Sequence, residues 1–142
     1  MKKILLVIIG VSVAFAANII RDNAKEVVVD SATHLMWQDN EDAKTVTKSW
    51  IEAIEYCESL TLAGFDDWRL PNIRELKYIA DINKINPAIV TGFENIAADY
   101  YWSSSTVMIN SYSAWGVYFW YGNSAQSGKK YVNYIRCVRD SN

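Results

Sequence analysis

Asp67-Trp68-Arg69-Leu70-Pro71-Asn72-Ile73-Arg74-Glu75 is the stretch that decides the fold, because it fixes where a helix begins. Asn72 is among the residue types that cap a helix through a side-chain oxygen. Glu75 lies three residues later and can reach back to the Asn72 amide, which makes a capping box. The stretch therefore predicts a helix over residues 73–81.

A second helix is predicted upstream of this stretch. Apolar residues recur there at intervals of 4, 3 and 3 residues, at Trp50, Ile54, Cys57 and Leu60. This spacing places them on one helix face, so Cys57 is expected to be buried. Gly64 is expected to end the helix, because glycine tolerates the left-handed conformation of a C-cap.

Short runs of β-branched and aromatic residues predict strands on both sides of the helices. Residues 19–24 show little pattern and are expected to be a lead-in, and residues 83–96 are expected to form a loop. Strands are expected at residues 26–29, 35–37, 101–105, 114–121 and 131–138, with turns at 30–33 and 122–123. The order of these elements predicts an α+β domain.

The N-terminus has the layout of a secretory signal. Lys2 and Lys3 precede an apolar run, and Ala14-Phe15-Ala16 supplies small residues around a cleavage site. We therefore predict a signal peptide over residues 1–16 and a single domain over residues 17–142. The alternative is an N-terminal membrane anchor, but the run is shorter than the roughly 20 residues that span a bilayer. After cleavage no stable membrane insertion is expected.

Charge limits the classes of partner. Loss of Lys2 and Lys3 lowers the basic residues from 14 to 12 against 16 acidic ones, a formal charge of −4. Nucleic-acid binders need clustered lysine and arginine for phosphate contacts, so no nucleic-acid partner is expected. An anionic ligand would have to meet a local basic patch.

The sequence contains two cysteines, Cys57 and Cys137. In the oxidising compartment that the signal implies, a disulfide between them is the natural pairing. Such a long loop would contribute about 4 kcal/mol in the chain-entropy model. Two buried free thiols are the competing interpretation.

Five separated motifs carry a family resemblance. They are Thr-His-Leu-Met-Trp-Gln at 33–38, Asp-Trp-Arg-Leu-Pro-Asn at 67–72 with Glu75-Leu76, Tyr-Trp-Ser-Ser at 101–104, Ala-Trp-Gly-Val-Tyr-Phe at 114–119 and Ile-Arg-Cys-Val-Arg at 135–139. Their order resembles the DUF1566 family, which is similar to the C-terminal domain of the Legionella collagen-like adhesin.

The resemblance implies a bacterial secreted or surface domain with a C-type-lectin-like fold, in which two helices pack on short antiparallel sheets. For the adhesin member it also implies binding of sulfated glycosaminoglycans. This chain departs from that member by having no collagen-like repeat and an acidic balance. His34 stands where glycine or a small polar residue is expected, and we interpret it as a surface substitution.

Catalytic and metal-binding arrangements are not predicted. A nucleophilic triad needs a base beside a serine or cysteine, but the sole histidine is His34 and Ser103 to Ser105 have no identifiable partner. Structural zinc takes four Cys or His ligands, and the chain has three such residues. We therefore expect a non-enzymatic protein without a cofactor.

Calcium is the remaining metal to consider, because oxygen ligands cluster at residues 39–42, 66–67 and 81–83. The first cluster lacks the glycine and terminal glutamate of an EF-hand loop, and solvated acidic turns are the simpler interpretation. Asp66 and Asp67 are expected to orient Arg69 or backbone amides, around a buried Trp68.

The late part of the chain supplies the candidate ligand-binding residues. Along residues 114–121, alternation together with the family pattern assigns Trp115, Val117 and Phe119 to the core and turns Tyr118 and Trp120 outward. Aromatic faces beside polar groups suit sugar rings or a protein partner. A loop or the Tyr112 segment covering them is the alternative. The predicted binding residues are Tyr112, Tyr118, Trp120, Lys129 and Lys130.

Lys129 and Lys130, with Arg136 and Arg139, form the basic concentration of the sequence. Alternation turns Arg136 and Arg139 to opposite faces, so a continuous patch does not follow, and a solvated strand edge is the other interpretation. The leading hypothesis is an extracytoplasmic binding domain for a glycan or anionic polysaccharide, as in adhesion. The alternative is a structural or assembly module of the cell envelope that binds protein, or another copy of itself, through exposed aromatics.

Overall fold

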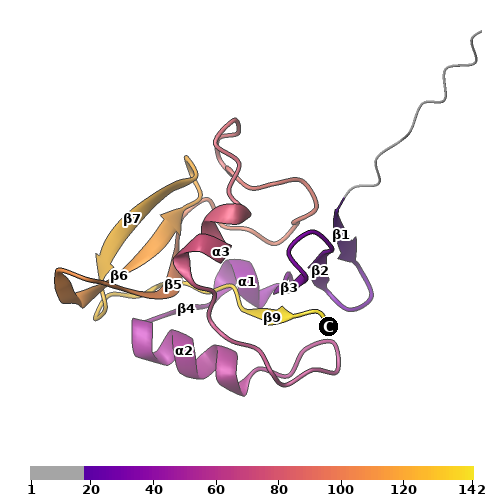
Figure 1. Ribbon diagram of the computed structural model, residues 1–142, viewed down its shortest axis with the longest axis horizontal. Helices are drawn as coiled ribbons and strands as arrows, with labels where there is room; N and C mark the ends of the chain where they lie inside the picture. Colours follow the sequence, from indigo (N-terminus) through magenta and orange to yellow (C-terminus); the bar gives the residue numbers. More distant parts are fainter. Residues whose placement is uncertain (1–17) are drawn as a thin grey trace, which may run out of the picture.

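The computed structural model describes residues 18–142, and the predicted signal peptide lies outside the described residues. Within residues 18–142 the chain forms three helices and two β-sheets (Figure 1). The helices are α1 (Asp42–Thr45), α2 (Trp50–Ser59) and α3 (Ile73–Tyr78). The strands are β1 (Ile19–Asp22), β2 (Val27–Asp30), β3 (Leu35–Gln38), β4 (Thr47–Lys48), β5 (Tyr100–Val107), β6 (Asn110–Tyr118), β7 (Asn123–Gly128), β8 (Asn133–Tyr134) and β9 (Val138–Asp140). The α+β class is confirmed.

The two sheets are joined by the last part of the chain. One sheet has the order β1-β2-β3-β9 and the other β4-β8-β5-β6-β7. Figure 1 shows β9 returning beside β3, which brings the C-terminus next to the first strands. All neighbours are antiparallel except β8 and β5, which pair in parallel at Tyr134 and Tyr101, so the expectation of purely antiparallel sheets is wrong there.

Both faces of the central strands are buried. On β5, Tyr100 and Trp102 pack into one core with Cys57 of α2, whereas Tyr101 packs into a second core with Leu76 of α3. Successive strand residues point to opposite faces, so the aromatic run at residues 100–102 contributes side chains to both cores. The two helices therefore cover opposite faces of β5.

The helix predictions are confirmed with different ends. The capping box of α3 is present, with Glu75 N donating to Asn72 Oδ1 at 2.9 Å and Asn72 N to Glu75 Oε1 at 2.9 Å. The helix ends at Tyr78 rather than Asp81, because the carbonyl of the capping residue Ile79 accepts the Val90 amide of the following loop at 2.9 Å and is not used to continue the helix. Within the described chain, no helix has the length and apolar character needed to cross a bilayer.

Helix α2 ends earlier than expected. Leu60, in an extended conformation, follows its last residue, and Gly64 lies in the separate turn between the bridged residues Leu62 and Phe65. Gly64 has φ +81°, so its freedom is used in that turn and not in a helix cap.

Three strand boundaries differ from those expected. Residues 19–22 form β1 instead of a lead-in, and β6 runs over Asn110–Tyr118 instead of residues 114–121. The expected last strand, 131–138, divides into β8 and β9 because the segment between them crosses from one sheet to the other. The strands expected at 26–29, 35–37 and 101–105 are confirmed with small shifts, and residues 83–96 form the expected loop.

The disulfide between Cys57 and Cys137 is present, with Cα atoms 5.5 Å apart. It joins α2 to the segment between β8 and β9, across a sequence separation of 80 residues. The bond therefore ties together the part of the chain that passes from one sheet to the other, which excludes the alternative of two free thiols.

Candidate functional site

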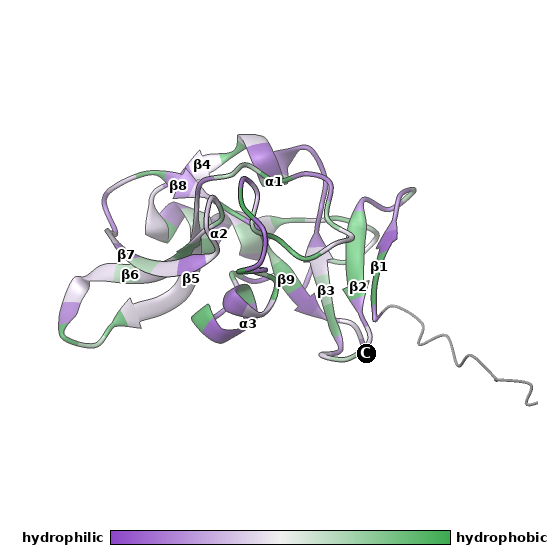
Figure 2. Cartoon of the chain, turned by 90° about the horizontal axis from the view of Figure 1, so that it is seen from above, coloured by the Kyte–Doolittle hydropathy of each residue, from purple (hydrophilic) through white to green (hydrophobic). Residues whose placement is uncertain are grey.

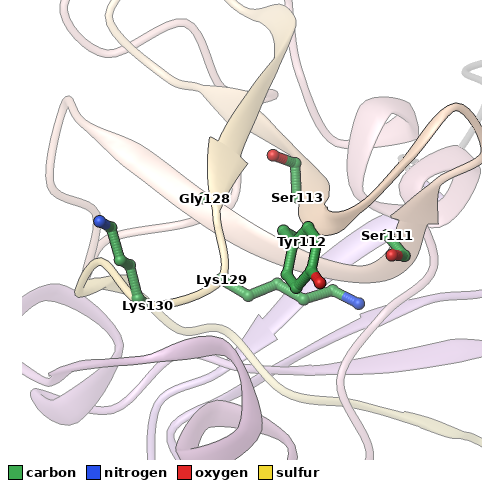
Figure 3. Close-up of a pocket in the computed structure, with 6 residues that line it drawn as sticks. All are labelled: Ser111, Tyr112, Ser113, Gly128, Lys129 and Lys130. Carbon is green, nitrogen blue, oxygen red and sulfur yellow. The ribbon is translucent and has the colours of Figure 1, made fainter.

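A surface pocket of about 550 Å³ lies where β6 begins and β7 ends. Figure 3 shows the residues that line it. The Tyr112 pocket, as we name it, is formed by Ser111, Tyr112, Ser113, Gly128, Lys129 and Lys130. Three of the five predicted binding residues thus meet in one place.

Backbone hydrogen bonds around Lys129 build this pocket. Its amide donates to the Tyr112 carbonyl oxygen at 2.8 Å, and its own carbonyl accepts the Trp50 amide at 3.0 Å. The turn after β7 is therefore fixed on one side to β6 and on the other to the first residue of α2. A side chain at Gly128 would press on the Tyr131 ring, since an added Cβ would lie 3.1 Å from it.

The two lysines of the Tyr112 pocket have different surroundings. The Lys129 ammonium lies 3.9 Å from the centre of the Trp50 ring and donates to Thr106 Oγ1 at 2.8 Å. Lys130 is exposed, with its ammonium 5.2 Å from the Tyr131 ring. In Figure 3 the two ammonium groups lie on opposite sides of Tyr112. Neither lysine is in an ion pair with any residue of 18–142.

Tyr118 and Trp120 lie away from the Tyr112 pocket. Tyr118 is at the opposite end of β6, six residues from Tyr112, which is about 20 Å along a strand. Tyr118 is half-buried and packs against the core that contains Tyr100, so its predicted outward position is only partly realised. Trp120 is exposed and pairs with Tyr121, whose ring centre is 6.4 Å away.

The core set predicted for residues 114–121 holds for two of its three members. Val117 and Phe119 are fully buried, but Trp115 is only half-buried. Residue 116 must be a glycine, because a Cβ added there would lie 2.2 Å from the Tyr101 carbonyl oxygen and 2.4 Å from the Tyr100 ring. Tyr121 is exposed because β6 ends at Tyr118, and a turn through Gly122, at φ +81°, then breaks the alternation.

Arg136 and Arg139 do not contribute to a basic surface. Arg136 is fully buried and donates to Asp39 Oδ1 at 2.9 Å, to the Gln38 carbonyl and to the Asn95 carbonyl. Arg139 is 5 % exposed and pairs with Asp67, its Nε 2.6 Å from Oδ1. The basic concentration of the sequence therefore reduces to the two lysines.

The acidic cluster at 39–42 begins with a buried residue and not with a solvated one. Asp39 is fully buried and accepts from Arg21 Nε at 2.6 Å as well as from Arg136. The amides of Glu94 and Asn95 also donate to its carboxylate, at 3.0 and 3.1 Å. Two guanidinium groups and two amides thus surround the oxygens that calcium would need.

Asp67 and Arg69 have separate partners, so of the two expected roles of Asp67 the orientation of Arg69 is wrong, whereas a backbone hydrogen bond at Asp67 is present. Arg69 instead makes a two-pronged ion pair with Glu75, at 2.8 and 2.9 Å. The Arg139 hydrogen bond lowers the pKa of Asp67. Burial opposes ionisation of Glu75, but the bonds from Arg69 and the Asn72 amide hold its pKa below the ordinary value. Trp68 is buried as expected.

Two of the serines considered as nucleophiles form hydrogen bonds with backbone groups. Ser103 donates its hydroxyl to the Trp115 carbonyl at 2.5 Å, and Ser105 Oγ accepts the Ile73 amide at 3.0 Å. His34 is exposed at φ +56°, the conformation that glycine favours. Among residues 18–142, no group of three or more His, Cys, Asp or Glu side chains is arranged to hold a metal ion.

The β5–β6 turn is a surface feature that no local sequence pattern had indicated. Met108 and Ile109, which we call the hairpin tip, are 95 % and 91 % exposed. In Figure 2 this apolar turn lies at the end of the molecule farthest from β1. The sequence contains the apolar pair Met108-Ile109 followed by Asn110. The exposure of this pair could be predicted only by knowing that residues 108–109 form a turn and not part of a strand.

Comparison with known protein families shows to which family the chain is related. A family model described as the Lcl C-terminal domain matches residues 26–139. The chain belongs to the Lcl C-terminal domain family. No curated protein matches it. The match includes both cysteines, the Tyr112 pocket and the hairpin tip, so these features lie within the Lcl C-terminal domain itself. This relationship makes the chain an adhesin-related domain.

Proposed function

We propose that this protein is an extracytoplasmic, non-enzymatic binding domain that holds an anionic polysaccharide at the Tyr112 pocket. The observation that carries the proposal is an exposed aromatic ring between two lysines without ion-pair partners among the described residues, on the domain of an adhesin-related family. The proposal includes a C-type-lectin-like fold, which the mixed sheets and the single disulfide support.

The disulfide supports the extracytoplasmic part of the proposal. Such bonds persist in oxidising compartments and are rare in the cytosol. The apolar and basic N-terminal segment is a second, independent argument, because its order of residues is that of a signal peptide.

The spacing of charges favours a polymer over a single small anion. The Lys129 ammonium is held by Thr106 and Trp50, that of Lys130 lies near Tyr131, and the two are on opposite sides of Tyr112 (Figure 3), so a chain with repeated charges suits these separately held lysines. Tyr112, 84 % exposed between them, offers its ring to a sugar face and its hydroxyl to sugar hydroxyls. The energy would come from stacking and two charges, so binding should weaken with salt.

A binding measurement with a sulfated polysaccharide such as heparin tests the proposal. We expect Lys129→Ala/Lys130→Ala to weaken binding on the order of tenfold, since each charge near the surface contributes somewhat under 1 kcal/mol. The matched control is Lys25→Ala/Lys44→Ala, which removes the same charge from lysines paired with Asp22 and Glu41. An equal loss in the control would show that only net charge matters, and the Tyr112 pocket would then be wrong.

A second candidate function, a protein-binding or assembly module, is favoured by a different surface. Trp120 and Tyr121 are exposed next to Ile85, and the Trp120 carbonyl accepts the amide of the adjoining Asn86 at 2.9 Å. If Trp120→Ala lowers the oligomeric state in light scattering but leaves polysaccharide binding intact, this surface serves assembly. Loss of polysaccharide binding in Trp120→Ala would instead extend the binding surface to the far end of β6.

A further inference from the structure

The hairpin tip has no role in the proposed function. Met108 and Ile109 are 95 % and 91 % exposed, and the antiparallel strands β5 and β6 on either side of them end at the pair Val107 and Asn110, with irregular pairing between this pair and Trp102. Exposed apolar groups that project together mark a surface that meets another apolar phase. Residues 106–113 contain no charged side chain, so nothing on the hairpin itself opposes burial.

Aromatic and cationic side chains lie close behind the apolar tip. Val107 pairs with Asn110, and Tyr112 lies two residues farther along β6, which is about 7 Å along the strand. Lys129 lies beside Tyr112, because its amide donates to the Tyr112 carbonyl, and Lys130 follows it. The Lys129 ammonium donates to Thr106 Oγ1 at 2.8 Å, two residues from Met108.

This combination of apolar, aromatic and cationic side chains matches the groups of a bilayer surface. Apolar side chains enter the acyl boundary, tyrosine is enriched at the headgroup level, and lysine is attracted to acidic headgroups. Peripheral elements enter this boundary by about 5 to 10 Å, a depth comparable with the tip-to-Tyr112 distance. Charge complementarity also selects one kind of lipid, because Lys130 has no acidic partner among the described residues.

We infer that the hairpin tip docks the protein on an acidic phospholipid surface, with Met108 and Ile109 in the acyl boundary and Lys130 at the headgroups. The contact is peripheral and involves two inserted side chains, not a span. A convex tip suits this partner better than a protein surface, because lipid closes around a projection whereas a protein would need a preformed pocket. Polysaccharide and lipid would compete for Lys130.

Vesicle co-sedimentation of the mature protein tests this inference. The probe is a vesicle of equal parts phosphatidylglycerol and phosphatidylethanolamine, compared with pure phosphatidylcholine. We expect binding to the acidic vesicles, and a loss on the order of thirtyfold in Met108→Ser/Ile109→Ser, because two apolar side chains no longer leave water. Lys130→Ala should weaken binding about fivefold.

The matched control is Ile20→Ser/Ile82→Ser, which removes two isoleucines that are 61 % and 80 % exposed elsewhere on the surface. It should bind vesicles as the unmodified protein does. No binding to acidic vesicles, equal binding by Met108→Ser/Ile109→Ser, or equal binding to phosphatidylcholine would each overturn the inference. Heparin binding by Met108→Ser/Ile109→Ser should be unchanged, so this inference and the proposed function can fail separately.

Discussion

Beside the sheet β1-β2-β3-β9 a set of charged groups lies inside the fold, whereas at the far end of β5 and β6 two lysines lie near exposed apolar side chains. Arg21 and Arg136 both bind the buried Asp39, and Arg139 is held against Asp67. Lys130 and the hairpin tip have no comparable contacts within residues 18–142. Charged side chains in this domain therefore have two roles. The buried ion pairs hold parts of the core together, whereas Lys130 is available to a ligand.

The largest effect is expected from the buried ion network. Asp39→Ala would leave Arg136 buried without its carboxylate, so we expect unfolding to become easier by about 3 to 5 kcal/mol. Urea denaturation followed by tryptophan fluorescence measures this. The control is Glu41→Ala in the same turn, whose partner Lys44 is exposed, and its effect should stay below about 0.5 kcal/mol. Equal effects in the two variants would remove the distinction between the two regions.

An intermediate effect is expected from Glu75, whose side chain is 16 % exposed while that of its partner Arg69 is 42 % exposed. The pKa of Glu75 is lowered in the folded protein, so its contribution is present above the ordinary value of 4.5 and is lost as the pH falls below it. Discounted for solvent screening, the contribution is about 1 kcal/mol. Urea midpoints measured from neutral to acidic pH should therefore fall less steeply in Glu75→Gln.

Asp67 adds to this acid sensitivity with the same sign, because Arg139 lowers its pKa. A Glu75→Gln protein should consequently retain some loss of stability in acid. If its midpoint falls as steeply as that of the unmodified protein, Glu75 is not one of the groups responsible.

The smallest effect on stability is expected at Lys130, in the Tyr112 pocket. Lys130→Ala should change the free energy of unfolding by less than about 0.5 kcal/mol, since its ammonium is 5.2 Å from the Tyr131 ring. Lys129→Ala should cost about 1 kcal/mol, because it loses both the Trp50 ring and Thr106. Thermal melting of the two variants side by side makes the comparison, and an equal loss in both would contradict the different environments of the two lysines.

Local patterns in the sequence were sufficient for the elements whose signals are local. The capping box at Asn72 and Glu75, the buried face with Cys57 and the short strands near the start all depend on spacing within a few residues. The disulfide followed from having two cysteines and a signal segment. Ends of elements were missed where distant backbone competes for the same groups, as at the end of α3.

Side-chain roles were predicted less well, because they depend on partners far away in the sequence. Arg136 and Asp39 are 97 residues apart, and nothing local indicates that one neutralises the other. The sequence analysis placed Tyr118, Trp120, Lys129 and Lys130 in one group, because the hairpin that carries them could be predicted. Where each residue lies along that hairpin could not be predicted. The register of β6 with β7 places Ser113 opposite Gly128 and Tyr118 opposite Asn123, which divides the group.

The sequence by itself determined the α+β class, the helix starts, the family motifs and the pairing of two cysteines, because each depends on local spacing or on residue identity. Only the tertiary structure decided which charges are buried, which aromatics meet and where the chain leaves an apolar tip uncovered. The physical reason is that burial is a property of what surrounds a side chain. For Arg136 those surroundings come from Gln38, Asp39 and Asn95, whereas for Lys130 they are mostly solvent.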